Sequence, residues 1–146
     1  MRRVRYIFDF SDSEIKELFS SVEMDVDKDQ IINWMKKEED EGFTTLYDKE
    51  LATFLNGLIV LKRGKKDGEI PIAEKKTNNN IVFRKLRIAL NLKDTDILEI
   101  MDLANFKMSK HELSAFFRKP NQSQYRPCKD QILRNFLQGL QMKLRG

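Results

Sequence analysis

Two stretches of this sequence share one pattern: ATFLNGLIVLKRG at residues 52–64 and RNFLQGLQMKLRG at residues 134–146. Both contain FLxGL and end in Arg-Gly, and both place a glycine inside a segment that otherwise has the pattern of a helix. An interior glycine costs a helix about 1 kcal/mol relative to alanine. A glycine that occurs twice in this setting therefore indicates a structural requirement and a duplicated segment.

The duplication extends over most of the chain. A shift of 82 residues aligns residues 4–64 with residues 86–146 without a gap. The identical pairs are Arg5/Arg87, Asp12/Asp94, Ile15/Ile97, Glu17/Glu99, Lys28/Lys110, Lys37/Lys119, Asp48/Asp130, Leu51/Leu133, Phe54/Phe136, Leu55/Leu137, Gly57/Gly139, Leu58/Leu140, Arg63/Arg145 and Gly64/Gly146. This register predicts a tandem repeat, with copies at 1–64 and 80–146. The polar segment 65–79, which contains Gly and Pro, is predicted to be a linker.

Each copy predicts four helices, because its apolar residues recur with the spacing of a helix face and no segment alternates like a strand. The predicted faces of the first copy are Val4/Ile7/Phe8, Ile15/Leu18/Phe19/Val22, Ile31/Trp34/Met35 and Leu51/Phe54/Leu55/Leu58. Those of the second copy are Val82/Leu86/Ala89/Leu90, Ile97/Ile100/Met101/Ala104, Leu113/Phe116/Phe117 and Leu133/Phe136/Leu137/Leu140. We therefore expect an all-α fold of two tandem four-helix repeats, about eight helices in all, related by a pseudo-two-fold axis.

Helix start signals fit this division. Ser11 to Glu14, Asp27 to Gln30 and Ser109 to Glu112 have the form of capping boxes or nearly so. Gly64 follows the last predicted turn of its copy, where a left-handed residue ends many helices. The repeated aspartates are also interpreted as helix-start residues: Asp12 and Asp94 as caps, and Asp48 and Asp130 as caps or first-turn residues.

The glycines of the last helix predict a close helix crossing. Gly57 and Gly139 lie at the margin of the apolar stripe of their helices. A missing side chain there allows a neighbouring helix to come close, and that neighbour could be the counterpart helix of the other copy. The alternative is that both glycines are merely tolerated.

The chain resembles the YehS-like family, small bacterial proteins built from a tandem repeat of unknown function. The resemblance rests on FLNGLIVLKRG, TNNNIVFRKLRIALNL, SKHELSAFFRK and DQILRNFLQGL. It covers essentially the whole chain and implies an all-helical repeat of bacterial, cytoplasmic origin, but no catalytic residues. One departure is that residues 78–83 of the second copy would have counterparts almost wholly before residue 1, so either the start lies further upstream or the first helix is short.

The composition favours a globular protein of reducing surroundings. Of its 146 residues 40% are hydrophobic and 34% charged, and Cys128 is the single cysteine, which excludes an intrachain disulfide and a cysteine-based zinc cluster. No stretch approaches the roughly 20 apolar residues of a membrane span. We expect no signal peptide, because the apolar run near the start is short and broken by Asp9. We expect the cytoplasm as its location.

No pattern of catalytic, metal-binding or cofactor-binding residues is evident. The single histidine, His111, aligns with Asp29, and Cys128 aligns with Leu46, which predicts a polar position and a small apolar slot. The acidic run EEDEG at 38–42 lacks the alternating ligands of an EF-hand and is read as a solvated helix end. The sequence therefore predicts a non-enzymatic protein without a cofactor or bound metal.

Charge is unevenly divided between the copies. Residues 80–146 hold 13 Lys and Arg against 6 Asp and Glu, whereas residues 1–66 hold 12 against 14. A basic second copy is a candidate for binding DNA, RNA or another polyanion through the backbone. The candidate residues, expected at helix ends and on exposed faces, are Arg84, Lys85, Arg87, Arg118, Lys119, Arg126, Lys129, Arg134 and Arg145. Carboxylates near the starts of the third helices weaken this reading.

The favoured reading is a protein-interaction scaffold, with a groove between two related bundles and equivalent loops at 38–47 and 120–127. Phe43 and Tyr125 match across the copies and are candidate aromatic anchors for a partner protein. The alternative for both is that they pack beneath the last helix of their copy.

Overall fold

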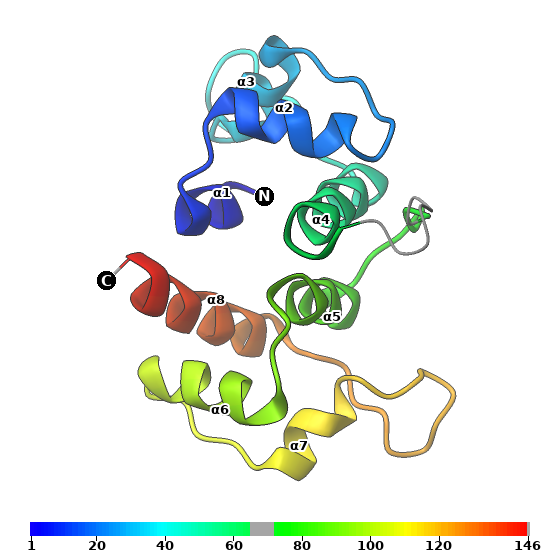
Figure 1. The fold of residues 1–146 in the computed structure, drawn as a ribbon, viewed down its shortest axis with the longest axis vertical. Helices are drawn as coiled ribbons and strands as arrows, with labels where there is room; N and C mark the ends of the chain where they lie inside the picture. Colours follow the sequence, from blue (N-terminus) through cyan, green and yellow to red (C-terminus); the bar gives the residue numbers. More distant parts are fainter. Residues whose placement is uncertain (65–71, 146) are drawn as a thin grey trace. The chain divides into compact units, whose positions relative to one another are not determined.

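The computed structural model describes residues 1–64 and 72–145, and within these ranges it contains eight α-helices and no strand (Figure 1). The chain divides into two compact units, Met1–Thr77 and Asn78–Gly146. The first unit holds α1 (Arg2–Phe8), α2 (Asp12–Ser20), α3 (Lys28–Met35) and α4 (Asp48–Arg63). The second holds α5 (Asn79–Leu90), α6 (Asp94–Leu103), α7 (Lys110–Ala115) and α8 (Asp130–Arg145). The predicted all-α class is confirmed.

The repeat is visible in local backbone detail. The starts of α2, α3 and α4 coincide with those of α6, α7 and α8 after the 82-residue shift. The left-handed residues that follow the first two helices of each unit obey the same shift, with φ of 54° and 62° in the first unit and 52° and 59° in the second; they are Asp9, Glu23, Asn91 and Asn105. Two copies of one backbone plan are therefore present.

The repeated aspartates of α2 and α6 hold the first helix of each unit. Arg5 Nη1 lies 2.6 Å from Asp12 Oδ1, and Arg87 Nη2 lies 2.9 Å from Asp94 Oδ1. The prediction that these aspartates are caps is wrong: each is the first residue of its helix, and the preceding residue is the N-cap. At this position each carboxylate forms an ion pair with an arginine of the preceding helix and does not act as the N-cap of its own helix.

The predicted helix starts are otherwise confirmed. Ser11, Asp27 and Ser109 each accept a hydrogen bond from the backbone N–H three residues on, and the side chain of that residue accepts from the cap N–H in return. Asp48 and Asp130 are the first residues of α4 and α8. Gly64 ends α4 with φ of 78°, a conformation that favours glycine. These bonds satisfy amide donors that a helix start would otherwise leave free.

The interior glycines mark close helix crossings. A Cβ placed on Gly57 would lie 2.8 Å from the carbonyl carbon of Leu18 and closer still to its oxygen. A Cβ on Gly139 would meet the carbonyl carbon of Ile100 at 2.8 Å and likewise its oxygen. The predicted crossing is confirmed, and tolerance of an unneeded glycine is excluded. At each glycine the crossing helix belongs to the same unit as the glycine: α2 crosses α4 at Gly57, and α6 crosses α8 at Gly139 (Figure 1).

Aromatic rings form the centre of each unit. In the first unit the ring centroid of Phe19 lies 5.5 Å from that of Trp34 and 6.0 Å from that of Phe54. In the second, the Phe83 centroid lies 4.6 Å from that of Phe136 and 5.0 Å from that of Phe117.

The predicted buried face of α5 is partly wrong. Val82 and Leu90 are only half-buried, and Phe83 is fully buried instead, so α5 turns the stripe Phe83/Leu86/Ala89 inward. The reason is the length of α5: the helix begins early enough for Phe83 to reach the ring cluster, whereas the aligned residue of the first copy is Met1, the N-cap of the shorter α1.

The predicted linker is only partly described. Residues 65–71 lie outside the described residues, so the prediction for them stays a prediction. Asn78 and Asn79, assigned to the linker from sequence, are the N-cap and first residue of α5, because the Asn78 side chain accepts a hydrogen bond from the N–H of Ile81 at 2.9 Å. The preceding Thr77 donates its N–H to Asp48 Oδ2 at 3.2 Å, within the first unit.

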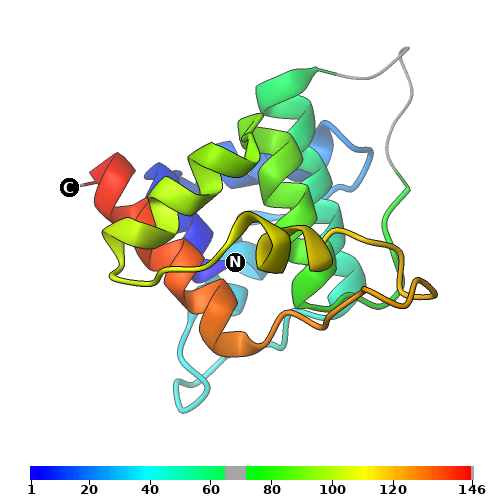
Figure 2. The same ribbon diagram turned by 90° about the horizontal axis from the view of Figure 1, so that it is seen from below.

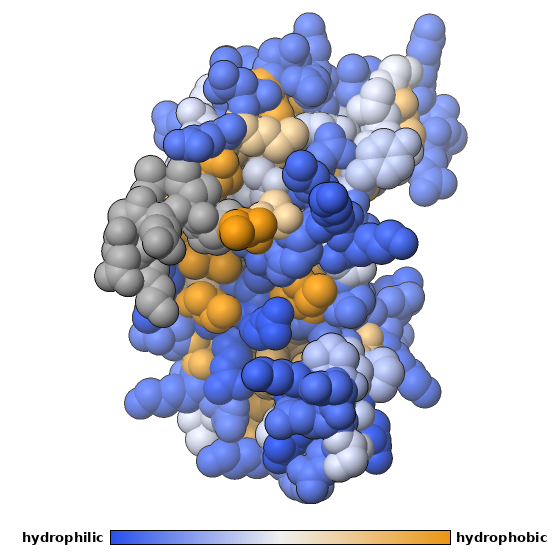
Figure 3. Space-filling model, turned by 90° about the vertical axis from the view of Figure 1, so that its right-hand side faces the viewer, coloured by the Kyte–Doolittle hydropathy of each residue, from blue (hydrophilic) through white to orange (hydrophobic). Residues whose placement is uncertain are grey.

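Hydrophilic residues cover most of the face drawn in Figure 3, with smaller hydrophobic patches between them. Tyr6 and Ile88, at equivalent positions of α1 and α5, are 52% and 45% exposed. Single exposed apolar side chains are common on protein surfaces and do not by themselves indicate a binding site.

Candidate functional site

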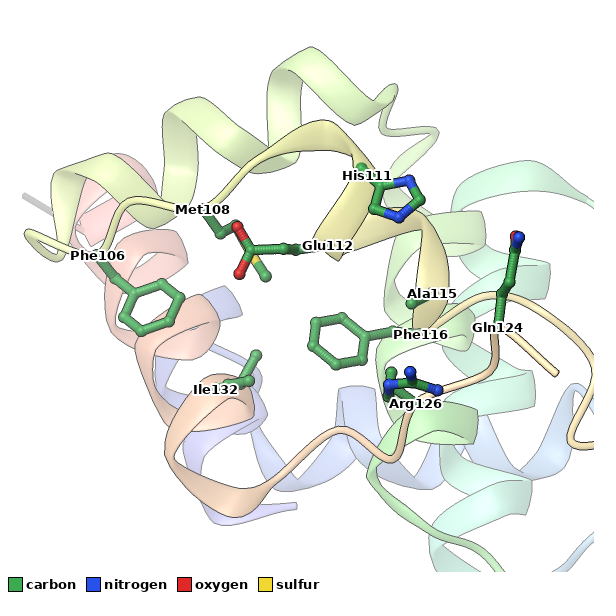
Figure 4. A pocket seen from close by; sticks show the side chains of 9 residues that line it. All are labelled: Phe106, Met108, His111, Glu112, Ala115, Phe116, Gln124, Arg126 and Ile132. Atoms are coloured by element: carbon green, nitrogen blue, oxygen red, sulfur yellow. The ribbon is translucent and has the colours of Figure 1, made fainter.

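The second unit contains a cavity of ≈ 400 Å³ between α7, the segments on either side of it and the start of α8 (Figure 4). Its lining residues come from four consecutive parts of the chain. They are Phe106 and Met108 before α7, His111, Glu112 and Ala115 on α7, Phe116, Gln124 and Arg126 after it, and Ile132 on α8. The cavity is therefore built wholly within one unit.

One wall of this cavity is apolar and its rim is polar. Phe116 is 7% exposed, and Phe106, Met108 and Ile132 are half-buried. Figure 4 shows the side chains of Phe106, Phe116 and Ile132 directed toward a common space, with His111 and Gln124 at its edge. An apolar surface that is covered on one side and open on the other can accept an apolar group from outside.

The two charged groups at the cavity are held by local hydrogen bonds. Glu112 Oε1 accepts the backbone N–H of Ser109 at 3.0 Å, and this bond, together with the Ser109 side chain, holds the pKa of the Glu112 carboxyl below its usual range. Arg126 donates from Nη1 to the carbonyl oxygen of Tyr125 at 2.9 Å. A fixed anion and a fixed cation thus flank the apolar wall.

Asn80 on α5 ties the wall and the rim together. Its Nδ2 donates to the carbonyl oxygens of Phe116 at 3.0 Å and Arg126 at 2.9 Å, and its Oδ1 accepts the N–H of Cys128 at 2.8 Å. The loop between α7 and α8 accordingly runs past the start of α5 (Figure 2). Asn80 is 8% exposed, so its side chain lies in the interior.

Sequence reasoning missed the role of the asparagines. Asn79 adds a second tie, since its Nδ2 donates to the carbonyl oxygen of Cys128 at 2.9 Å and to Asp130 Oδ1 at 2.7 Å. The signal was present as the run Asn78-Asn79-Asn80, in which only one residue can cap the helix and the other two need partners of their own.

The equivalent region of the first unit has the same backbone frame with different side chains. Thr44 donates its N–H to the carbonyl oxygen of Asn33 at 3.2 Å, and Arg126 donates to Ala115 in the same way at 3.2 Å. The first unit has Glu50 where the second has Ile132 and Thr44 where it has Arg126. The two units therefore share this backbone hydrogen bond and differ in the side chains that line the region.

The predicted basic residues differ in their exposure and in their contacts. Arg84, Lys119, Arg126, Lys129, Arg134 and Arg145 are exposed, and Arg118 is half-buried. Lys85 is 8% exposed, so its prediction as an exposed cation is wrong: its position falls on the inward side of α5 beside Leu86. Arg87 is paired with Asp94 and lies with its guanidinium carbon 4.7 Å from the centroid of the Phe117 ring. Arg126 is the one predicted cation at the α7–α8 cavity.

Phe43 and Tyr125 occupy equivalent turns, and both are half-buried. Each donates its backbone N–H to the residue three before it, Asp40 at 3.2 Å and Gln122 at 3.1 Å. Their partial burial therefore matches neither a fully exposed aromatic anchor nor a ring packed completely beneath the last helix. Their role in partner binding stays a prediction.

Cys128 is a buried thiol. Cys128 is 4% exposed, and burial, with a smaller contribution from Asp130, raises the pKa of its thiol to about 11. The thiol is therefore protonated at neutral pH and a poor nucleophile. Within residues 1–64 and 72–145 no three His, Cys, Asp or Glu side chains are grouped closely enough to hold a metal ion. The helices of the same ranges include none long and apolar enough to span a membrane.

Comparison with known proteins agrees with this architecture. The family model described as "Protein of unknown function (DUF1456)" matches residues 1–64 and 79–146 separately. The chain belongs to this family. It is 41% identical over 141 residues to "Uncharacterized protein YehS" of Escherichia coli (strain K12), an alignment that covers 96% of this chain and 90% of that protein. No solved structure matches the chain. The two matched regions of the DUF1456 family coincide with the two helical repeats.

Proposed function

We propose that this chain is a non-enzymatic protein-interaction module of the cytoplasm, and that the α7–α8 cavity binds an apolar side chain of a partner protein. The observation that carries this proposal is the apolar wall of Phe106, Met108, Phe116 and Ile132, open to the outside in a cavity of ≈ 400 Å³. Binding pockets for small groups commonly enclose about 300–1,000 Å³.

The chemistry of the cavity favours binding over catalysis. Protein partners are held chiefly by a few apolar or aromatic side chains that fill pockets, with polar groups at the rim fixing orientation. Glu112 and Arg126 supply such a rim, one of each sign. A carboxyl whose pKa is lowered is a weak base near neutral pH, so Glu112 is poorly suited to proton transfer.

The test is to fill the cavity by enlarging one of the side chains that line it. Ala115→Trp places a large side chain into the cavity, and a photoactivatable benzoylphenylalanine at Gln124 reports any partner that reaches the rim in intact cells. We expect a discrete crosslinked protein whose yield falls at least about tenfold in Ala115→Trp, as expected for loss of a central contact.

Thr45→Trp is the matched control, because Thr45 is exposed and lies in the first unit. It should leave the crosslink unchanged, and thermal melting of both variants establishes that they are folded. A crosslink that persists in folded Ala115→Trp, or the lack of any discrete crosslink, would refute the proposal.

A second candidate function is binding of DNA or RNA through the phosphate backbone. It is supported by the excess of cations in residues 80–146 and by the side chains of Arg84, Lys119, Lys129 and Arg134, which are exposed and have no ion-pair partner among the described residues. Neutralising phosphates releases counterions, so such binding weakens steeply with salt.

Gel-shift titration with duplex DNA and structured RNA at several salt concentrations tests this candidate. The double variant Arg118→Glu/Lys119→Glu is expected to abolish the shift. The equivalent pair of the first unit, Lys36→Glu/Lys37→Glu, is the control with the same change of charge and should retain it. Lack of a shift at low salt, or equal loss in both variants, would exclude specific use of the second unit.

A further inference from the structure

A second cavity of the second unit, of ≈ 360 Å³, is basic. It lies where the end of α5, the start of α6 and the start of α7 meet, and is lined by Arg87, Leu92, Lys93, Asp94, Thr95 and Lys110. Three cations thus face one carboxylate. No residue is shared with the α7–α8 cavity, so the two cavities are separate sites.

Arg87 is held in place at the edge of this cavity. Its Nη2 is paired with Asp94 at 2.9 Å, and its guanidinium lies against the ring of Phe117, with the carbon 4.7 Å from the ring centroid. A guanidinium carries five N–H donors in a fixed fork. The ion pair with Asp94 is made through Nη2, one nitrogen of this fork.

Lys93 is a cation where the first unit has a helix cap. The equivalent residue, Ser11, accepts the backbone N–H of Glu14 at 3.1 Å. Lysine has no acceptor atom, so the side chain of Lys93 cannot accept the N–H of Asp96 in this way. A positive charge at the start of a helix is also unfavourable. The second unit has thus exchanged a stabilising residue for a cation that lines the cavity.

Lys110 completes the set of cations. It is exposed, and its counterpart Lys28 is exposed as well. The first unit therefore has Arg5 and Lys28 at the equivalent positions but Ser11 in place of Lys93. Two of the three cations are common to both units, and the third is particular to the second.

We propose that this basic cavity binds a phosphate group. A phosphate offers one negative charge as a diester or up to two as a monoester, together with several acceptor oxygens, which match a forked guanidinium, two ammonium groups and the hydroxyl of Thr95. The cavity is larger than a phosphate, so it leaves room for the organic part of a phosphorylated molecule. The phosphate belongs either to a free phosphomonoester or to the phosphodiester backbone of a nucleic acid, and the test separates these sources.

The probes are inorganic phosphate, phenyl phosphate and a short DNA duplex, each titrated into the full chain labelled with ¹⁵N. We expect saturable chemical-shift changes in the amides of Lys93, Asp94 and Thr95. Lys93→Ser, which installs the residue of the first unit, and Lys110→Ala should each weaken binding at least about tenfold, as expected when a charge-assisted hydrogen bond is lost. Lys93→Ser should also raise the melting temperature without phosphate, because serine caps the helix.

Lys107→Ser is the matched control: Lys107 is an exposed lysine of the same unit outside the cavity lining, and its loss should weaken binding less than about twofold. Saturation by phenyl phosphate alone identifies a phosphomonoester, and saturation of the same amides by the duplex identifies a phosphodiester. The proposal is overturned if no probe moves these amides in a saturable way, or if Lys107→Ser weakens binding as much as Lys93→Ser.

Discussion

Replacing Gly57 by alanine is expected to lower the free energy of unfolding by about 2 kcal/mol or more, although alanine is the better helix former. The added Cβ would lie 2.8 Å from the carbonyl carbon of Leu18 and would overlap its oxygen. These are backbone atoms of α2, so relief requires the two helices to separate and not a side chain to rotate. The same reasoning applies to Gly139→Ala, where the obstacle is the carbonyl group of Ile100 on α6.

The direction of the stability change on Gly→Ala substitution distinguishes a close helix crossing from its absence. Without a crossing helix, Gly→Ala inside a helix stabilises by about 1 kcal/mol, so the melting temperature would rise. With the crossing, it should fall by roughly 8 °C or more. Thermal and urea unfolding measure the effect. Met142→Ala, one turn beyond Gly139 and 43% exposed, is the control and should change stability by no more than about 0.5 kcal/mol. A rise in melting temperature for either glycine variant would disprove the close approach.

The glycines also show what a sequence can predict about a helix crossing. Gly57 and Gly139 lie at the margin of the apolar stripe of their own helices, and this position predicts that another helix comes close. Helical periodicity fixes the face on which contact occurs but not which helix supplies it. That choice depends on the loops and on the remaining faces, and here it falls on α2 for Gly57 and on α6 for Gly139, each within the same unit.

The repeated aspartates illustrate a second limit. The match of Asp12 with Asp94 predicts that both do the same work, and they do. Their role was predicted wrongly as helix capping, because an N-cap and a first-turn residue lie one position apart and are often the same residue types. The alignment also paired Arg5 with Arg87, and a repeated charge of each sign seven residues apart was the available sign of an ion pair.

The α7–α8 cavity could not be predicted from sequence. A cavity exists where neighbouring side chains fail to fill space, and periodicity describes only the residues that do fill it. Its residues come from four segments joined by turns, and only Arg126 was among the predicted site residues. His111 was read as a polar surface position, and it is exposed at the cavity edge.

Replacing Asn80 by alanine is expected to cost about 3 kcal/mol, the second large effect. The change removes three hydrogen bonds, two of them buried and one partly buried, and leaves the carbonyl oxygens of Phe116 and Arg126 and the N–H of Cys128 without this partner. Each lost bond costs about 1 kcal/mol, and a buried group left unpaired costs more. The loop that carries Arg126 and the wall that carries Phe116 would then lose their common support, so the cavity should lose its shape.

The neighbouring asparagines allow the stability cost of Asn80→Ala to be compared with that of milder substitutions. Asn78→Ala removes a single cap and should cost about 1 kcal/mol, and Asn79→Ala removes two bonds nearer the surface, so both should be milder than Asn80→Ala. Urea unfolding gives the three values. Hydrogen exchange of the Cys128 amide adds a local readout, because its N–H donates to Asn80 and should exchange much faster in Asn80→Ala while the amides of α4, in the first unit, stay protected. Equal costs for the three variants, or an unchanged Cys128 amide, would mean that the loop is held by other contacts and that Asn80 does not organise the cavity.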